Sequence, residues 1–269
     1  MYPYDIIKGI DLYTIFLALG IVAAIVTFSK CADKIGLGAK FHNLSLIAAV
    51  LGIGLGYFSA IFFQALYNIP KNGGFVISEE TGATFYGGLI GGAAGFILVY
   101  FVLGALRLKD DRKYLVKNFF AVANVAAASI AVAHALGRIG CFFAGCCHGK
   151  VTDAWYGVFM VEVGEKVVPT QLFEGAFLFC LFALFLWRIF RGKRYQLPIY
   201  MAAYGAWRFV IEYFRDDYRG TTVVEFLTPS QFIALLMILG AVALCLIEKK
   251  ICDKYLIKES SSDDVKLEQ

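Results

Sequence analysis

Long runs of apolar residues alternate with short polar segments along most of this chain. A helix needs about 20 consecutive apolar residues to cross a bilayer. The pattern therefore predicts an all-α integral membrane protein with about seven transmembrane helices. The predicted spans are Leu12–Ser29, Asn43–Leu66, Tyr86–Leu106, Phe119–Leu136, Gln171–Phe190, Leu197–Phe214 and Ser230–Ile247.

The apolar runs favour helices over the strands of a barrel. Barrel strands alternate polar and apolar residues in segments of about ten, and Phe177–Leu186 shows no alternation. The second, third and fourth spans are rich in glycine and alanine, which lets helices approach closely. We expect a single transmembrane domain over residues 1–258 and a disordered, polar, cytoplasmic tail over residues 259–269.

Basic residues give the orientation of the spans, because Lys and Arg stay on the cytoplasmic side. Of the 25 basic residues, 17 lie in segments 30–40, 107–117, 188–194 and 249–266, which follow the first, third, fifth and seventh spans. The sequence thus predicts an N-terminus outside and a cytoplasmic C-terminus.

Composition agrees with a membrane protein and excludes several other classes. The chain is 59% hydrophobic and 17% charged, whereas soluble domains average about 25% charged residues. The 25 Phe and 15 Tyr exclude a disordered chain. A net charge of +4 is explained by topology, so we expect no nucleic-acid partner.

Arg208 lies well inside a predicted span, where charged residues are costly and usually functional, and Arg138 lies at the outer end of another. Arg208 precedes Glu212 by four residues, so the two share a helix face and can form an ion pair. That pair could be structural or functional. Arg138 follows His134 by four residues and is surrounded by glycines, where backbone can approach a ligand closely. Arg138 could also only snorkel to the interface.

Further polar groups and glycines mark the starts of two spans. Gly87 and Gly88 open the third span, where they permit tight packing or contact with a ligand. Gln171 and Glu174 lie in the first turn of the fifth span.

By the predicted topology, these groups share the outer layer of the membrane with Arg215. A guanidinium binds phosphate oxygens with two parallel hydrogen bonds. The sequence therefore predicts a pocket for an anionic lipid headgroup, formed by Arg138, Arg208, Arg215, Gly87, Gly88, Gln171 and Glu174.

Three of the seven cysteines cluster beyond the fourth span. Cys141, Cys146 and Cys147 match no paired metal-binding spacing, so we expect no metal. A disulfide from Cys141 to Cys146 or Cys147 is more plausible in an oxidising outer compartment.

With these residues in view, the chain resembles the bacterial prolipoprotein diacylglyceryl transferases. The resemblance rests on five blocks in family order, which are Tyr67–Pro70, Phe85–Gly91, Gly137–Gly140, Pro169–Glu174 and Tyr204–Arg215.

The resemblance implies an enzyme that takes the diacylglyceryl group of phosphatidylglycerol and attaches it by a thioether to the lipobox cysteine of a prolipoprotein, releasing glycerol phosphate. It implies no cofactor and a multi-pass protein of the bacterial cytoplasmic membrane with its site on the extracytoplasmic side. Arg138, Arg208 and Glu212 match residues that the family needs.

Other family positions are replaced. Tyr86 stands where the family has histidine, and the family's arginine of the second span is absent at Ile53-Gly54. Two asparagines and a glutamate of the family correspond to Cys141, Ala144 and Cys146.

Because of these replacements, a residue outside the family pattern must accept the proton of the acceptor thiol. We expect Arg138 and Arg208 to stabilise the departing phosphate and Glu212 to hold Arg208 in position. His134, with a reference pKa near 6.5, is our candidate for taking the thiol proton, with Tyr86 as its hydrogen-bond partner. Alternatively, His134 only bonds a neighbouring helix.

Other functions stay open at this point. A paralogue could bind or transfer the same lipid with a different acceptor, which the replaced residues favour. A transporter would show internal repeats and broken helices at the midplane, and a thiol-redox protein would need a Cys-x-x-Cys pair; neither pattern occurs.

Overall fold

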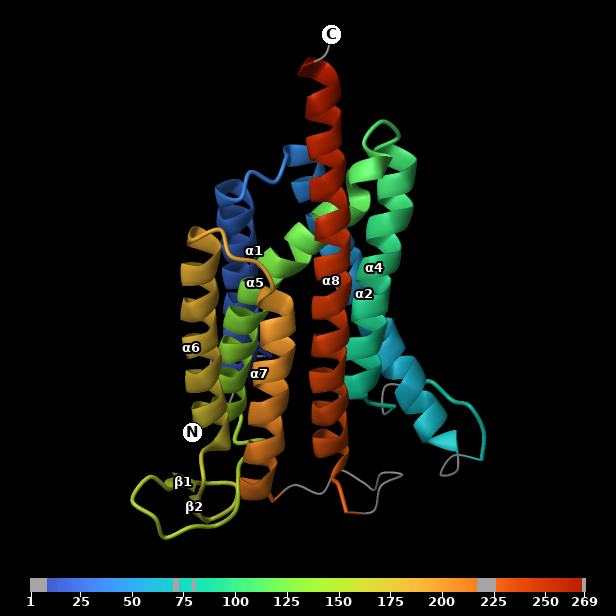
Figure 1. Cartoon of the computed structure of the whole chain (residues 1–269). Coiled ribbons are helices and arrows are strands. Elements are labelled where there is room, and N and C mark those ends of the chain that lie inside the picture. The colour runs from blue at the N-terminus through green and yellow to red at the C-terminus, as the bar shows by residue number, and fades with distance from the viewer. Residues whose placement is uncertain (1–8, 70–72, 79–80, 217–225, 268–269) are drawn as a thin grey trace. The chain divides into compact units, whose positions relative to one another are not determined.

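The computed structural model describes residues 9–69, 73–78, 81–216 and 226–267, without the side chains of residues 85, 86 and 254–267. The chain divides into two compact units, residues 37–122 and the segments 1–36 and 123–269. The elements in chain order are α1 (Leu12–Lys34), α2 (Ala39–Tyr67), α4 (Phe85–Arg107), η1 (Arg112–Tyr114), α5 (Leu115–Phe143), β1 (Val158–Met160), β2 (Glu165–Val167), α6 (Thr170–Phe190), α7 (Gln196–Ile211), η2 (Glu212–Phe214) and α8 (Pro229–Leu267) (Figure 1).

The predicted all-α membrane fold is confirmed, since each of the seven predicted spans falls on helix. Within the described residues, six helices are long and apolar enough to cross a bilayer. The exception is α7, which has 16 residues and continues into the 3₁₀ turn η2. The count of seven crossings stays a prediction, as does the division into a domain over residues 1–258 and a disordered tail.

Local chemistry explains where several helices begin and end. The side chain of Asp11 accepts a hydrogen bond of 2.8 Å from the backbone N–H of Thr14 and so caps α1. Lys34, Arg107 and Arg188 lie in the last turns of α1, α4 and α6, where a cation is favoured by the helix dipole.

In the unit of residues 37–122, α2 and α4 pack through glycines, as the composition of these spans predicted. A Cβ on Gly56 would lie 2.9 Å from the carbonyl oxygen of Gly88, and a Cβ on Gly91 would overlap the side chain of Ser59. Only glycine allows the two backbones to come this close.

In the other unit, a buried polar contact joins three helices far from the β-hairpin. Asn124 of α5 donates to Glu248 of α8 at 2.7 Å and accepts from the backbone N–H of Gln196, the first residue of α7, at 2.6 Å. Both side-chain groups of Asn124 therefore have partners, so burying this amide costs little stability.

The opposite end of this unit carries the short antiparallel hairpin of β1 and β2. Figure 1 shows the hairpin where α6 and α8 begin and where α7 ends. The loop after α5 also returns here, because Gly149 forms a bridge with Arg215 and its N–H donates to Val168 at 2.8 Å. Side chains from several helices therefore meet at this end.

Candidate functional site

A buried ion pair joins α5 to α6. Nη2 of Arg138 lies 2.8 Å from Oε2 of Glu174, and these side chains are only 11% and 2% exposed. Burying either charge alone would be costly, so each needs the other. Nε of Arg138 is buried and has no hydrogen-bond partner among the described residues.

Tyr204 and His134 complete the surroundings of Glu174. The hydroxyl of Tyr204 donates to Oε1 of Glu174 at 2.7 Å, and Nε2 of His134 lies 3.6 Å from the same oxygen. The other ring nitrogen of His134 shares a hydrogen bond of 3.0 Å with the hydroxyl of Tyr200. His134 thus contacts both α6 and α7.

The expected ion pair forms on α7. Nη2 of Arg208 lies 2.8 Å from Oε2 of Glu212 and donates to Oγ of Ser230 at 2.8 Å. Nε of Arg215 is 3.9 Å from the same Glu212 oxygen. One carboxylate therefore holds two guanidinium groups at the end of α7.

The start of α8 fixes this carboxylate from the other side. The hydroxyl of Thr228 donates to Oε1 of Glu212 at 3.1 Å and accepts from the backbone N–H of Gln231 at 3.2 Å. The Gln231 side chain accepts in return from the N–H of Thr228 at 3.1 Å. This reciprocal pattern is a capping box, and Pro229 follows it at the first helical position.

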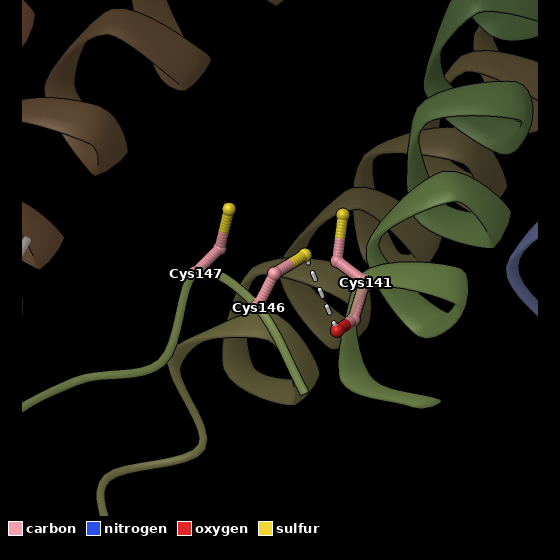
Figure 2. Close-up of side chains that lie close together, drawn as sticks. All are labelled: Cys141, Cys146 and Cys147. Carbon is pink, nitrogen blue, oxygen red and sulfur yellow. Dashed lines mark hydrogen bonds between the residues drawn. The ribbon is translucent and has the colours of Figure 1, made fainter. Parts of the chain in front are cut away.

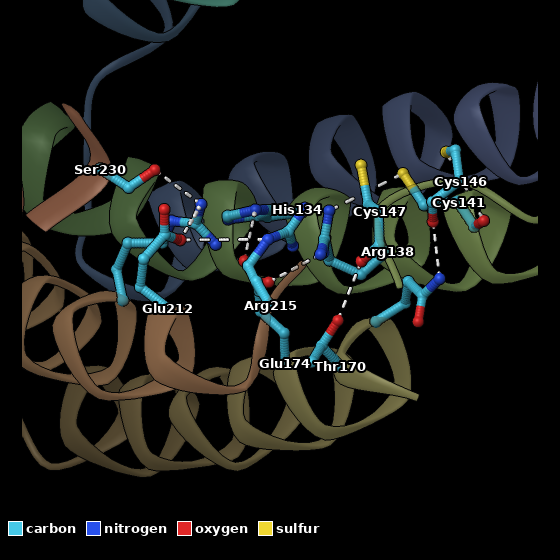
Figure 3. A network of polar contacts seen from close by, with 12 residues as sticks. His134, Arg138, Cys141, Cys146, Cys147, Thr170, Glu174, Glu212, Arg215 and Ser230 are labelled. Carbon is cyan, nitrogen blue, oxygen red and sulfur yellow. Dashed lines mark hydrogen bonds and ion pairs between the residues drawn. The ribbon is translucent and has the colours of Figure 1, made fainter. Parts of the chain in front are cut away.

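The two ion pairs belong to one polar layer. Glu174 pairs with Arg138, and Glu212 pairs with both Arg208 and Arg215. Figure 3 shows Arg138, Glu174, Arg215 and Glu212 together in this layer. The structure thus brings together guanidinium groups from two helices, α5 and α7.

The loop after α5 is fastened to the first turn of α6. The side chain of Thr170 donates to the carbonyl of Cys147 at 2.8 Å, and that of Gln171 donates to the carbonyl of Cys146 at 2.6 Å. Gln171 therefore supports the loop in this structure, and its predicted contact with a headgroup stays a prediction.

Three thiols converge near Arg138, as the expected disulfide from Cys141 to Cys146 or Cys147 requires, but no disulfide joins them. The Sγ atoms of Cys141, Cys146 and Cys147 all lie within 4.8 Å of one another, and each thiol is free (Figure 2). Nη1 of Arg138 lies 3.9 Å from Sγ of Cys141. Hydrogen bonds from Cys141 and Cys146, with the charges of Arg138 and Arg215, lower the pKa of Cys147.

The remaining predicted residues lie in the unit of residues 37–122. Gly87 and Gly88 are in the first turn of α4, and the hydroxyl of Ser59 donates to the carbonyl of Gly87 at 2.9 Å. Both glycines face α2, so packing accounts for them, and their role toward a headgroup stays a prediction. The side chain of Tyr86 lies outside the described part of the structure.

The sequence predicts no role for four residues that hold the charged groups, namely Tyr200, Tyr204, Thr228 and Ser230. Two of them carried a signal: Tyr204 begins one of the family blocks, and the spacing of Thr228-Pro-Ser-Gln231 is typical of a capping box.

The fold and the site define an α-helical integral membrane protein with a buried layer of arginine–glutamate pairs. The family model for prolipoprotein diacylglyceryl transferase matches residues 5–247, and the chain belongs to this family of transferases of lipoprotein biosynthesis.

Several curated relatives match most of the chain. Phosphatidylglycerol–prolipoprotein diacylglyceryl transferase 2 of Clostridium perfringens is 29% identical over 90% of this chain and 93% of its own length. The transferase of Clostridium tetani is 32% identical over 84% of this chain and 88% of its own. That of Dehalococcoides mccartyi strain 195 is 31% identical over 77% of this chain and 78% of its own.

Proposed function

We propose that this protein transfers the diacylglyceryl group of phosphatidylglycerol to the lipobox cysteine thiol of prolipoproteins and releases glycerol phosphate. The observation that carries the proposal is the polar layer itself. Arg138 and Arg208 come from different helices, are each about nine-tenths buried, and each pairs with a buried carboxylate. The relatives with this printed activity support the same substrates.

The phosphate of the lipid suits the donors of this layer. A phosphodiester carries one negative charge, and Arg138 offers the buried Nε–H that lacks a partner among the described groups. As the carbon–oxygen bond breaks, charge builds up on the phosphate, and guanidinium groups fixed in place stabilise it without reorganisation.

The carboxylates position these arginines. Glu174 holds Arg138, and Glu212 holds Arg208 and Arg215, so each guanidinium keeps its orientation before lipid arrives. Fixed donors do not lose side-chain entropy at the moment of binding.

The site faces the extracytoplasmic side of the bacterial cytoplasmic membrane in this proposal. The distribution of Lys and Arg supports an outer N-terminus and a cytoplasmic C-terminus. With α7 and η2 counted as the seventh crossing, the hairpin end of the bundle is the outer end. This is the side on which a secreted acceptor is exposed.

The role of His134 as base for the acceptor thiol stays a prediction. Its two ring nitrogens lie near Tyr200 and Glu174, so a purely structural role is also served by these contacts. If His134→Gln keeps full turnover while Arg208→Ala abolishes it, the base assignment is wrong. If both variants lose turnover and His134→Gln also shifts the pH profile, it is right.

The proposal is tested with purified protein, phosphatidylglycerol vesicles and a lipobox peptide. We expect glycerol phosphate and a peptide heavier by one diacylglyceryl group, and no product from the peptide with serine in place of cysteine. Lipid binding without transfer to the cysteine peptide would refute the proposal and favour a paralogue with another acceptor.

A further inference from the structure

The thiols of Cys141, Cys146 and Cys147 form a cluster that the proposed roles of the arginines leave unused. Their sulfur atoms lie within 4.8 Å of one another, and Cys146 is exposed while the other two are half-buried. A disulfide joins two sulfur atoms, so it would leave one of these three thiols unpaired.

The spacing of the sulfurs fits a metal ion better than a disulfide. Zinc–thiolate bonds of about 2.3 Å place tetrahedral sulfur ligands about 3.8 Å apart. The cluster therefore needs to contract by about 1 Å at most to hold such an ion. A disulfide needs its two sulfurs at about 2.05 Å and leaves the third thiol without a role.

The backbone is held in a conformation that turns the sulfurs toward one another. Cys147 has a φ of 62°, which is rare for a residue with a side chain, and Gly145 has a φ of 73°. This turn brings Cys146 and Cys147 back over Cys141 at the end of α5 (Figure 2). Thr170 and Gln171 hold the turn through the carbonyls of Cys147 and Cys146.

Such local strain persists only where surrounding contacts enforce it, and it is found preferentially at functional sites. Nη1 of Arg138 lies 3.9 Å from Sγ of Cys141. Hydrogen-bond donors commonly surround the ligands of a metal ion in this way.

We infer that Cys141, Cys146 and Cys147 bind a soft divalent cation of the zinc class and leave its fourth position open for the thiol of the acceptor. This inference rests on the proposed function for the identity of the fourth ligand. Catalytic zinc sites keep three protein ligands and one exchangeable position, and thiolates select soft cations.

The open position explains how the acceptor thiol loses its proton. A thiol that coordinates zinc is deprotonated, and its proton leaves to water at the exposed side of Cys146. The bound sulfur then attacks the glycerol carbon that carries the phosphate. A sulfur–carbon bond forms, a carbon–oxygen bond breaks, and its electron pair leaves with glycerol phosphate toward Arg138.

The product has no negative charge on sulfur, so the thioether is a poor ligand and dissociates. A thiol that is already ionised on the metal does not need His134 as a proton acceptor. His134→Gln thus separates this inference from the base assignment.

The first experiment measures metal binding without any need for activity. The full-length protein in lipid nanodiscs is reduced, stripped with a chelator and titrated with Co²⁺. We expect one Co²⁺ per chain and a thiolate-to-cobalt charge-transfer band. Cys141→Ser, Cys146→Ser and Cys147→Ser should each bind Co²⁺ at least 100-fold more weakly.

Cys180→Ser is the matched control, because Cys180 is an exposed free cysteine on α6 and lies outside the cluster. It should keep the band. Unfolding temperatures show whether the cluster variants fold, and Zn²⁺ should raise that temperature in the wild type and in Cys180→Ser but not in the cluster variants.

The second experiment adds the acceptor. A lipobox peptide with cysteine should strengthen the charge-transfer band, and the serine peptide should not. Removal of the metal should lower transfer at least 100-fold, and Zn²⁺ should restore it.

Three results would overturn the inference. They are a band that survives in the cluster variants, full transfer by the metal-free protein, and a disulfide among the three cysteines in the active protein. A metal site that forms without any transfer by the loaded protein would instead refute the proposed function.

Discussion

Arg138→Lys tests the assignment of the phosphate to the polar layer. Lysine keeps the positive charge beside Glu174 but presents its donors from one nitrogen and lacks the fork of a guanidinium. The buried ion pair with Glu174 can still form, so we expect only a small change in unfolding temperature. The lost element is the Nε–H that has no partner among the described groups.

The size of the effect follows from one hydrogen bond. A hydrogen bond to a charged group contributes about 1.5–3 kcal/mol, which corresponds to a loss of about 10- to 150-fold in kcat/KM. The assay is the release of glycerol phosphate at a saturating concentration of lipobox peptide, with phosphatidylglycerol varied.

The control is the same substitution at Arg188. Arg188 lies in the last turn of α6, at the opposite end of this helix from Glu174, and donates to the carbonyl of Arg194 at 2.7 Å. Arg188→Lys should leave kcat/KM unchanged. If Arg138→Lys also stays within threefold of the wild type, Arg138 does not bind the phosphate, and the assigned role is wrong.

Three further predictions concern the carboxylate of α7, the glycine contact and the topology. Glu212→Gln removes the charge that holds two arginines, so kcat/KM should fall at least tenfold and the unfolding temperature should drop; an unchanged temperature would argue against a buried pair. Gly91→Ala places a Cβ against α2 and should cost about 1–3 kcal/mol, whereas Gly54→Ala meets open space and should not destabilise the protein. In intact cells, Trp155→Cys should gain labelling by a membrane-impermeant maleimide and Lys193→Cys should not; the reverse pattern would invert the topology.

The sequence predicted the helices well, because lipid imposes a single simple requirement on each span. Every backbone polar group must be satisfied within its own helix, so hydrophobic length alone locates the spans. The prediction was weakest for Leu197–Phe214. There the helix α7 ends at Ile211, and the charged residues that interrupt the apolar pattern continue into a 3₁₀ turn.

The pairing of Arg208 with Glu212 could be predicted because residues four apart meet on a helix. The pairing of Arg138 with Glu174 could not, since it depends on how α5 packs on α6. The same holds for Tyr204 and its hydrogen bond to Glu174.

The thiol cluster shows a different limit. The spacing of Cys141, Cys146 and Cys147 matches no metal motif, and their approach depends on a left-handed backbone at Cys147. Few residues with side chains adopt that conformation, so sequence pattern gives no reason to expect it.

The central claim is that guanidinium groups from α5 and α7 bind one lipid phosphate, and a structure with phosphatidylglycerol bound tests it most directly. We expect phosphate oxygens within about 3 Å of nitrogen atoms of both Arg138 and Arg208. A phosphate bound elsewhere, or held by only one of these two residues, would contradict the account.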